Sequence, residues 1–252
     1  MKRELYNLGN EEFAFFVNRA GEALNKIGVP YTFVGGSAVQ AHTLKRLCEK
    51  YQTDISTLLQ NKDIRFQDYI RSTDDIDLAL LFPDNGQDNS FARSVSQRLC
   101  DSLEGVYLSA NEESLFEYKL VRKGISRPVF SIGVDDKSGE NLALNISKQS
   151  RHLRGLGLKF YDSFIEQGQE LQIPYSKGND IKIRVYRPEH VLATKISQFR
   201  AKDSMDLSNL VKVMQESGEE IDKEELRKVL LPVYVNNLGR FSSLTGIDID
   251  LN

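Results

Sequence analysis

Two aspartates, Asp75 and Asp77, lie two residues apart in the stretch RSTDDIDLALL at residues 71–81. The apolar run around them predicts a strand, on which both carboxylates share one face while Ile76 and Leu78 share the other. Two neighbouring carboxylates repel each other unless a cation lies between them, and hard oxygen ligands at this spacing suit Mg²⁺. Arg71 falls on the same face if the strand extends that far back, where it would contact an anion. The alternative is a solvent-exposed pair of surface acids.

A second candidate site is the stretch FVGGSAVQA at residues 33–41, where a short strand meets Gly35, Gly36 and Ser37 and then a helix. Glycine is unfavourable inside either element, so the pair indicates a sharp turn or a ligand close to the backbone. Free N–H groups at a helix start form a phosphate-binding site. Combined with an Asp-x-Asp strand, this turn supplies the parts for nucleotidyl transfer from a metal-bound triphosphate.

A lysine and an aspartate in the C-terminal half form a third candidate site. If residues 189–214 were one helix, Lys195 and Asp206 would occupy nearly the same angular position, because they are eleven residues apart. Both would then lie within an apolar stripe, so they form either a buried ion pair or part of a cleft. The stripe consists of Leu192, Ile196, Phe199 and Leu210.

The elements that must position these residues follow from the apolar periodicity and the turn residues. The pattern predicts an α+β (α/β) fold: a mixed β-sheet flanked by helices, with a C-terminal helical bundle. We expect one domain over residues 1–186 and a helical domain over residues 187–252. Helices are expected at 11–27, 37–51, 90–104 and 158–167, with a short one after Asp54; strands at 31–34, 75–81, 115–122, 128–134 and 141–147, then a hairpin at 171–186; and helices from Pro188 to the end.

The composition is that of an ordinary globular protein of 252 residues with a net charge of −3. Cys48 and Cys100 define no disulfide framework, which favours a reducing cytoplasm. The sequence shows no signal peptide and no apolar run that could span a membrane, so no membrane partner is expected. Residues 118–159 contain nine Lys/Arg and three Asp/Glu, which indicates either a phosphate-bearing partner or a solvated face.

These motifs together resemble the nucleotidyltransferase superfamily that includes DNA polymerase β, whose signature is Gly-Gly/Ser followed by Asp-x-Asp/Glu on the next strand. The chain is more closely similar to the AbiEii/AbiGii toxin branch of abortive-infection and toxin–antitoxin systems. The segments that carry this closer resemblance are RPEHVLATKISQF and AKDSMDLSNL, in that order. The resemblance implies a nucleotidyltransferase-type sheet over roughly residues 30–215.

The resemblance also implies roles for individual residues. Gly36 and Ser37, beside Gly35, would hold the β- and γ-phosphates. Asp75 and Asp77 would bind magnesium. Lys195, together with Asp203 or Asp206, would complete the nucleotide and acceptor site.

One position departs from the family pattern. The superfamily often has a third carboxylate on a later strand, and the matching run LALNIS places Asn145 there. Asparagine can ligate magnesium but cannot act as a general base. The base is therefore elsewhere, with Asp135 and Asp136 nearby in the sequence, or metal binding is weakened, or the protein is inactive.

The expected function is that of a Mg²⁺-dependent nucleotidyltransferase of the phosphotransferase class. It would move an NMP from an NTP to an acceptor such as a tRNA, as a toxin-like protein with an antitoxin partner. One rival is a non-catalytic nucleotide- or RNA-binding module that retains the fold. The other is a transferase that acts on a protein or small-molecule hydroxyl.

Overall fold

One mixed sheet organises the chain. The computed structural model describes residues 11–65, 68–70, 75–81, 94–95, 98–99, 116–122, 128–135, 141–147, 163–176, 178–230 and 235–250. The sheet has seven strands in the order β3-β4-β5-β2-β1-β7-β6. The strands are β1 (Tyr31–Phe33), β2 (Asp75–Leu80), β3 (Phe116–Arg122), β4 (Pro128–Asp135), β5 (Asn141–Ser147), β6 (Gln169–Ser176) and β7 (Asn179–Val185).

Strand β2 lies at the centre of the sheet, between β5 and β1. It pairs in parallel with β5 and antiparallel with β1. The successive strands β3, β4 and β5 pair antiparallel, as do β6 and β7, whereas β1 and β7 are parallel. The predicted strands and hairpins are therefore confirmed, and so is the predicted fold class of a mixed sheet flanked by helices.

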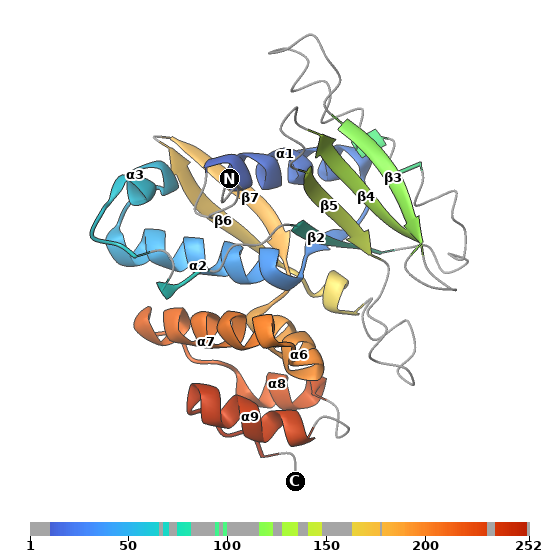
Figure 1. Ribbon diagram of the computed structural model, residues 1–252. Helices are drawn as coiled ribbons and strands as arrows, with labels where there is room; N and C mark the ends of the chain where they lie inside the picture. Colours follow the sequence, from blue (N-terminus) through green and yellow to red (C-terminus); the bar gives the residue numbers. More distant parts are fainter. Residues whose placement is uncertain are drawn as a thin grey trace, which may run out of the picture.

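Helices cover both faces of the sheet. Helix α1 (Glu11–Ile27) packs against β7, and α2 (Gly35–Tyr51) packs against β6 and β2. Figure 1 shows the β6–β7 part of the sheet between these two helices. Their apolar sides form one core with the strands, because the buried residues of α1, α2 and the sheet belong to a single cluster. The short helix α3 (Ile55–Gln60) follows α2 and is capped by Asp54, as predicted.

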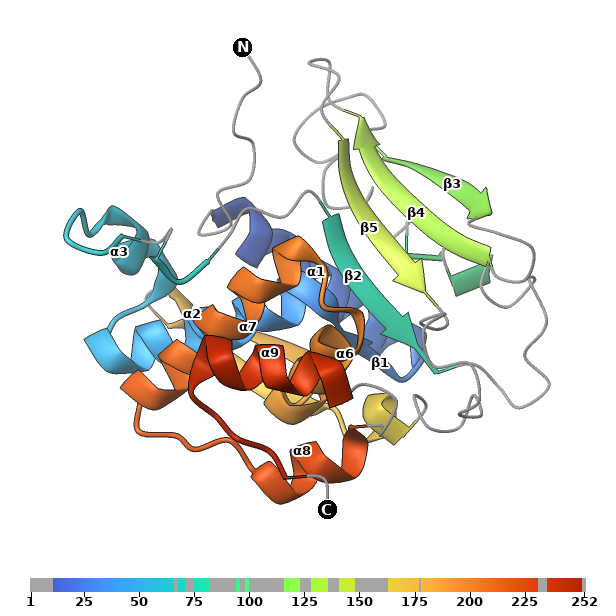
Figure 2. The same ribbon diagram turned by 60° about the horizontal axis from the view of Figure 1, so that its bottom comes forward.

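The C-terminal helices form a further layer on α2. They are α6 (Pro188–Gln198), α7 (Ala201–Glu216), α8 (Lys223–Val229) and α9 (Val235–Thr245). Helices α6 and α7 pack against α2, while α8 packs on α6 and α9 packs on both α6 and α7. In Figure 2, α9 lies in front of α6 and α7. The predicted division at residues 186/187 stays a prediction, since the helices after it pack directly on α2.

The condition of one continuous helix over residues 189–214 is not met. Phe199 adopts a left-handed conformation with φ of 39° and ends α6. Arg200 then caps α7, and Asp203 in the first turn of α7 accepts from the Arg200 backbone N–H at 2.9 Å. The chain therefore turns between the two helices. Lys195 and Asp206 meet because the helices pack together, not because they share one helical stripe.

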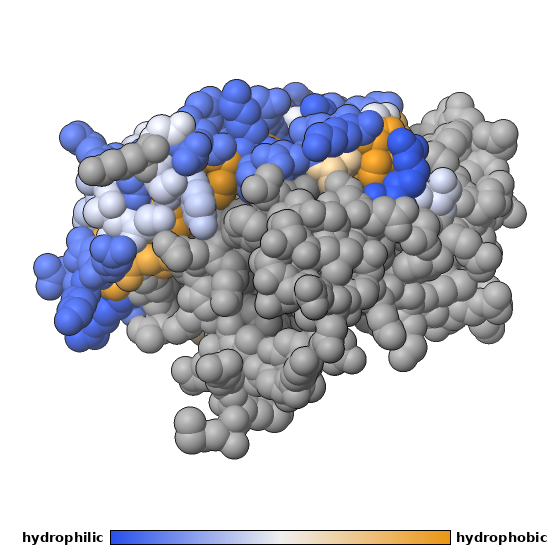
Figure 3. Space-filling view, turned by 90° about the horizontal axis from the view of Figure 1, so that it is seen from above, coloured by the Kyte–Doolittle hydropathy of each residue, from blue (hydrophilic) through white to orange (hydrophobic). Residues whose placement is uncertain are grey.

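The side of the molecule seen from the top of Figure 1 is mostly hydrophilic where it is described. Figure 3 shows only scattered apolar residues on this face. Among the described side chains of α1, Val17, Ala20, Ala23 and Leu24 lie in the core, as the helical periodicity predicts. Within the described ranges, none of the helices has the length and apolar character needed to traverse a bilayer.

Candidate functional site

The glycine turn and the Asp77 strand are joined by close contacts. Ser37 Oγ accepts a hydrogen bond from the Asp77 backbone N–H at 3.1 Å, and the two residues are forty positions apart. The Val34 N–H donates to the Asp77 carbonyl at 2.9 Å. Gly35 has φ of +61°, and a Cβ there would lie 2.6 Å from Asp77 Oδ2. The two motifs found separately in the sequence therefore form one structural unit.

Helix α2 begins at Gly35, two residues earlier than predicted. Its N-cap Val34 offers no side-chain hydrogen bond, and its first turn contains no acidic residue. The first N–H groups of a helix have no intrahelical acceptor, and the helix dipole makes that end positive. Gly35 and Gly36 are half-buried, whereas Ser37 is buried. The Ser37 hydroxyl accepts from Asp77 but retains its own proton to donate.

The oxygen-bearing positions around β2 have the chemistry of a magnesium site. Asp77 is half-buried, and Asp75 lies two positions earlier on the same strand. Asn145 on β5 is the register partner of Asp77. Carboxylate and amide oxygens are the ligands that Mg²⁺ prefers. Arg71 and the side chain of Asp75 lie outside the described residues, among which no group of three or more His, Cys, Asp or Glu could hold a metal.

Lys195, Asp203 and Asp206 form a buried charge cluster between α6 and α7. Lys195 Nζ lies 2.5 Å from Asp206 Oδ2 and 3.4 Å from Asp203 Oδ1. All three residues are at most 3% exposed. The structure thus brings together the three residues that the sequence assigned to the helical half, and it places the lysine in an ion pair.

Arg200, which was missed at the sequence level, binds Asp203 of the buried charge cluster. Its guanidinium binds Asp203 through two hydrogen bonds, Nε to Oδ2 at 2.8 Å and Nη2 to Oδ1 at 3.0 Å. Those bonds raise the pKa of Arg200, and the charges of Asp77 and Asp206 raise it further. Burial alone would raise the pKa of Asp203, but the Arg200 hydrogen bonds and the Lys195 charge lower it overall. The one sequence signal for Arg200 is its place three residues before an aspartate at a helix start.

An open groove of about 560 Å³ lies beside this cluster, between the start of α7 and α9. The guanidinium of Arg240 lies 4.1 Å from the ring centroid of Phe199 on its wall. The rest of the wall includes Ser204, Asn236, Ser243 and Leu244. Arg240 is the charged side chain of the described lining, so the groove has positive character.

No protein-family model matches the chain, and no curated protein matches its sequence. Several solved structures are similar to it at low identity, and three of them are described here. An antigenic nucleotidyltransferase-like protein from Paracoccidioides brasiliensis is 15% identical with a TM-score of 0.44, covering 96% of this chain and 95% of that one. The antibiotic-resistance factor ANT(2'')-Ia is 12% identical with a TM-score of 0.41, covering 92% and 94%.

The third structure is MenT4, a nucleotidyltransferase toxin from Mycobacterium tuberculosis. It is 14% identical with a TM-score of 0.42, covering 86% of this chain and 62% of that one. None of the three is described as an AbiEii or AbiGii protein. At these scores none of the three likenesses carries an argument about this chain.

Proposed function

We propose that this protein is a Mg²⁺-dependent nucleotidyltransferase that moves an NMP from an NTP to an acceptor hydroxyl. The observation that carries the proposal is the contact between the start of α2 and β2: Ser37 Oγ accepts from Asp77 N at 3.1 Å. This contact sets the free N–H groups of a helix start beside a carboxylate of the Asp-x-Asp pair. A triphosphate on those N–H groups would meet a metal held by that pair.

Each group has a distinct role in this proposal. The N–H groups of Gly35, Gly36 and Ser37 bind the phosphates, while Asp75 and Asp77 hold the metal beside Asn145. Bound Mg²⁺ supplies Lewis-acid activation of the attacking hydroxyl and charge stabilisation of the leaving pyrophosphate. The hydroxyl oxygen forms a bond to the α-phosphorus as the bond from that phosphorus to the pyrophosphate oxygen breaks. The hydroxyl proton leaves to water or to a carboxylate.

The charge cluster of the helical half positions Arg200 for this chemistry. Lys195 and Arg200 neutralise Asp203 and Asp206 at the start of α7. The Arg200 side chain is 51% exposed, so its guanidinium is accessible to a phosphate while Asp203 holds it. An arginine presented in this way suits charge stabilisation at a phosphoryl group.

We propose an RNA end, such as that of a tRNA, as the acceptor. The groove beside α9 supports this, because the charged side chain of its described lining is the cation Arg240. Such a groove suits a polyanion better than a polycationic small molecule. A toxin-like role with an antitoxin partner rests on the AbiEii/AbiGii resemblance, and a cytoplasmic location rests on the two cysteines that define no disulfide framework.

A second function is favoured by one observation. Asn145, not a carboxylate, occupies the register position beside Asp77. An asparagine cannot take the acceptor proton, so a nucleotide- or RNA-binding module without catalysis is the alternative.

The test is to incubate the purified protein with each α-labelled NTP, Mg²⁺ and total tRNA. We expect the wild type to transfer label to RNA. The variant Asp77→Asn should lose this transfer, and it should also lose the affinity for Mg·NTP that calorimetry measures in the wild type. The matched control is Asp63→Asn, which makes the same charge change in an exposed turn after α3. Affinity without label transfer would support the binding module, and unchanged affinity in Asp77→Asn would exclude this site.

A further inference from the structure

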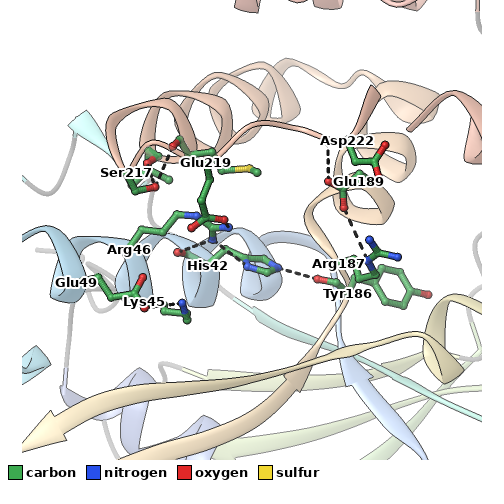
Figure 4. Close-up of polar contacts among 12 residues, drawn as sticks. His42, Lys45, Arg46, Glu49, Tyr186, Arg187, Glu189, Ser217, Glu219 and Asp222 are labelled. Carbon is green, nitrogen blue, oxygen red and sulfur yellow. Dashed lines mark hydrogen bonds and ion pairs between the residues drawn. The ribbon is translucent and has the colours of Figure 1, made fainter. Parts of the chain in front are cut away.

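A buried histidine in the middle of α2 has hydrogen bonds at both ring nitrogens. His42 Nε2 lies 2.7 Å from the Tyr186 carbonyl oxygen, and Arg46 Nη1 lies 3.1 Å from His42 Nδ1 (Figure 4). An arginine can only donate and a carbonyl can only accept. Nδ1 is therefore the acceptor and Nε2 carries the proton, so the ring is held in one neutral tautomer.

The neutral form is also favoured by the surroundings of the ring. Burial lowers the pKa of His42 to about 3, and the Arg46 charge contributes to this. Protonation would require Nδ1 to give up its role as acceptor. Both hydrogen bonds therefore persist at neutral pH.

The Tyr186 bond closes a ring of contacts that includes the candidate site. The Tyr186 N–H donates to the Phe33 carbonyl of β1 at 3.1 Å, and the residue after Phe33, Val34, donates to the Asp77 carbonyl at 2.9 Å. Asp77 N–H then donates to Ser37 Oγ at 3.1 Å, which returns to α2. The path thus runs from α2 through the segment after β7, then through β1 and β2, and back to α2.

Resting on the proposed function, we infer that His42 is a positioning residue that holds α2 so that its N-terminal turn stays against Asp77. Two of the polar contacts of α2 lie on this path. Ser37 joins its first turn to β2, and His42, about 7.5 Å further along the axis, joins it to the segment after β7. Without the His42 contact, the N-terminal half of α2 keeps its core packing but has fewer directional contacts that fix its position, and displacements of about 1 Å at a phosphoryl-transfer site cost rate by roughly 100-fold.

Through Arg46, the hydrogen bond at His42 Nδ1 also connects α2 to the C-terminal helices. Arg46, which is buried, also binds Glu219 with Nη2 to Oε2 at 2.6 Å. Glu219 follows α7, so the residue that fixes the His42 tautomer is itself held by the helical layer. Glu219 is partly exposed, with 43% of its side chain accessible, which makes it the weaker end of the chain of contacts.

The experiment compares His42→Leu, His42→Gln and His190→Leu. His42→Leu removes both hydrogen bonds, whereas the Gln amide can still donate near the Nε2 position. His190 on α6 is the matched control because it is equally buried and makes none of the hydrogen bonds in this path, and its ring touches the path through an edge contact with the Tyr186 ring, 6.2 Å between centroids. Its closest charged neighbour in the described chain is Glu225, whose Oε1 lies 3.5 Å from Nε2 without hydrogen-bond geometry.

Two readouts are taken well below the melting temperature of each variant. The first is the calorimetric affinity for Mg·NTP, which reports the candidate site. The second is backbone amide exchange in peptides that contain Val34 and Asp77, which reports the contacts that α2 makes with the central strands.

We expect His42→Leu to weaken Mg·NTP affinity about 10- to 100-fold, the range found when supporting contacts of a site are removed. Amide exchange should rise at Val34 and Asp77 but not in α9. His42→Gln should recover most of the Mg·NTP affinity and most of the amide protection at Val34 and Asp77. His190→Leu should leave the affinity and the protection unchanged, although it lowers the stability of the protein. Equal effects of the two leucine variants would overturn the inference. If the wild type binds no Mg·NTP, the proposed function fails, and the amide exchange still decides whether His42 holds α2.

Discussion

The ion pair of Lys195 with Asp206 determines what a substitution at this lysine does. Lys195→Ala removes the ammonium that lies 2.5 Å from a carboxylate only 2% exposed. We expect the free energy of unfolding to fall by about 3–5 kcal/mol, the usual cost of breaking a buried pair by removing one partner. Urea denaturation at neutral pH measures this.

The double variant Lys195→Met/Asp206→Leu is the control. Replacing both charges by apolar groups of similar size should restore much of the loss, because Asp206 is then no longer left as an unpaired buried charge and Asp203 keeps its ion pair with Arg200. A Lys195→Ala protein of wild-type stability with no turnover would instead mean that the lysine acts on the triphosphate.

At the level of elements, the first turn of α2 depends on glycine at position 35. Gly35→Ala introduces a Cβ at a φ of +61° and 2.6 Å from Asp77 Oδ2, so the carboxylate must move. We expect a loss of stability larger than the roughly 1–2 kcal/mol of left-handed strain alone, and a loss of Mg·NTP affinity. Denaturation and calorimetry on the same variant measure the two effects.

Gly28→Ala provides the matched comparison. Gly28 has φ of +75°, and no heavy atom of the described chain lies within 4 Å of the position that an alanine Cβ would take. This variant therefore reports the backbone strain without the contact. If the two variants lose the same stability and both bind Mg·NTP normally, the turn at Gly35 has no role in nucleotide binding.

For the whole molecule, two buried histidines predict the pH dependence of stability. Burial lowers the pKa of His42 to about 3 and that of His190 to about 4. Below pH 6.5 the unfolded chain takes up a proton at each histidine while the folded chain does not, so stability falls as the pH falls. Between pH 7 and pH 5 each histidine should lower the free energy of unfolding by about 2 kcal/mol.

Urea unfolding at both pH values checks this. The free energy of unfolding should differ between pH 7 and pH 5 by less in His42→Gln and in His190→Leu than in the wild type. Each variant should lose the part of this difference that comes from its own histidine, which is about half of what the two histidines contribute together. A pH dependence that is the same in both variants and in the wild type would contradict the assignment of these two groups.

Local sequence patterns predicted most of the elements. The Asp-x-Asp alternation predicted β2, the turn residues predicted the hairpins of β3, β4 and β5, and Asp54 predicted the start of α3, because these signals lie within a few residues of the element they specify. The break at Phe199 was not predictable in the same way. An aromatic residue has no intrinsic preference for the left-handed conformation, so packing between α6 and α7 selects it.

For the candidate site, the sequence by itself determined which residue types were available: glycines at a helix start, carboxylates two apart on a strand, and a lysine with aspartates in an apolar region. Only the tertiary structure decided their neighbours. It placed Ser37 on Asp77, gave Lys195 two carboxylates, brought Arg200 into the electrostatic range of Asp77, and closed the contacts of His42. The physical reason is that each of these contacts joins separate elements of the fold, and their distances are set by how helices and strands pack rather than by spacing along the chain.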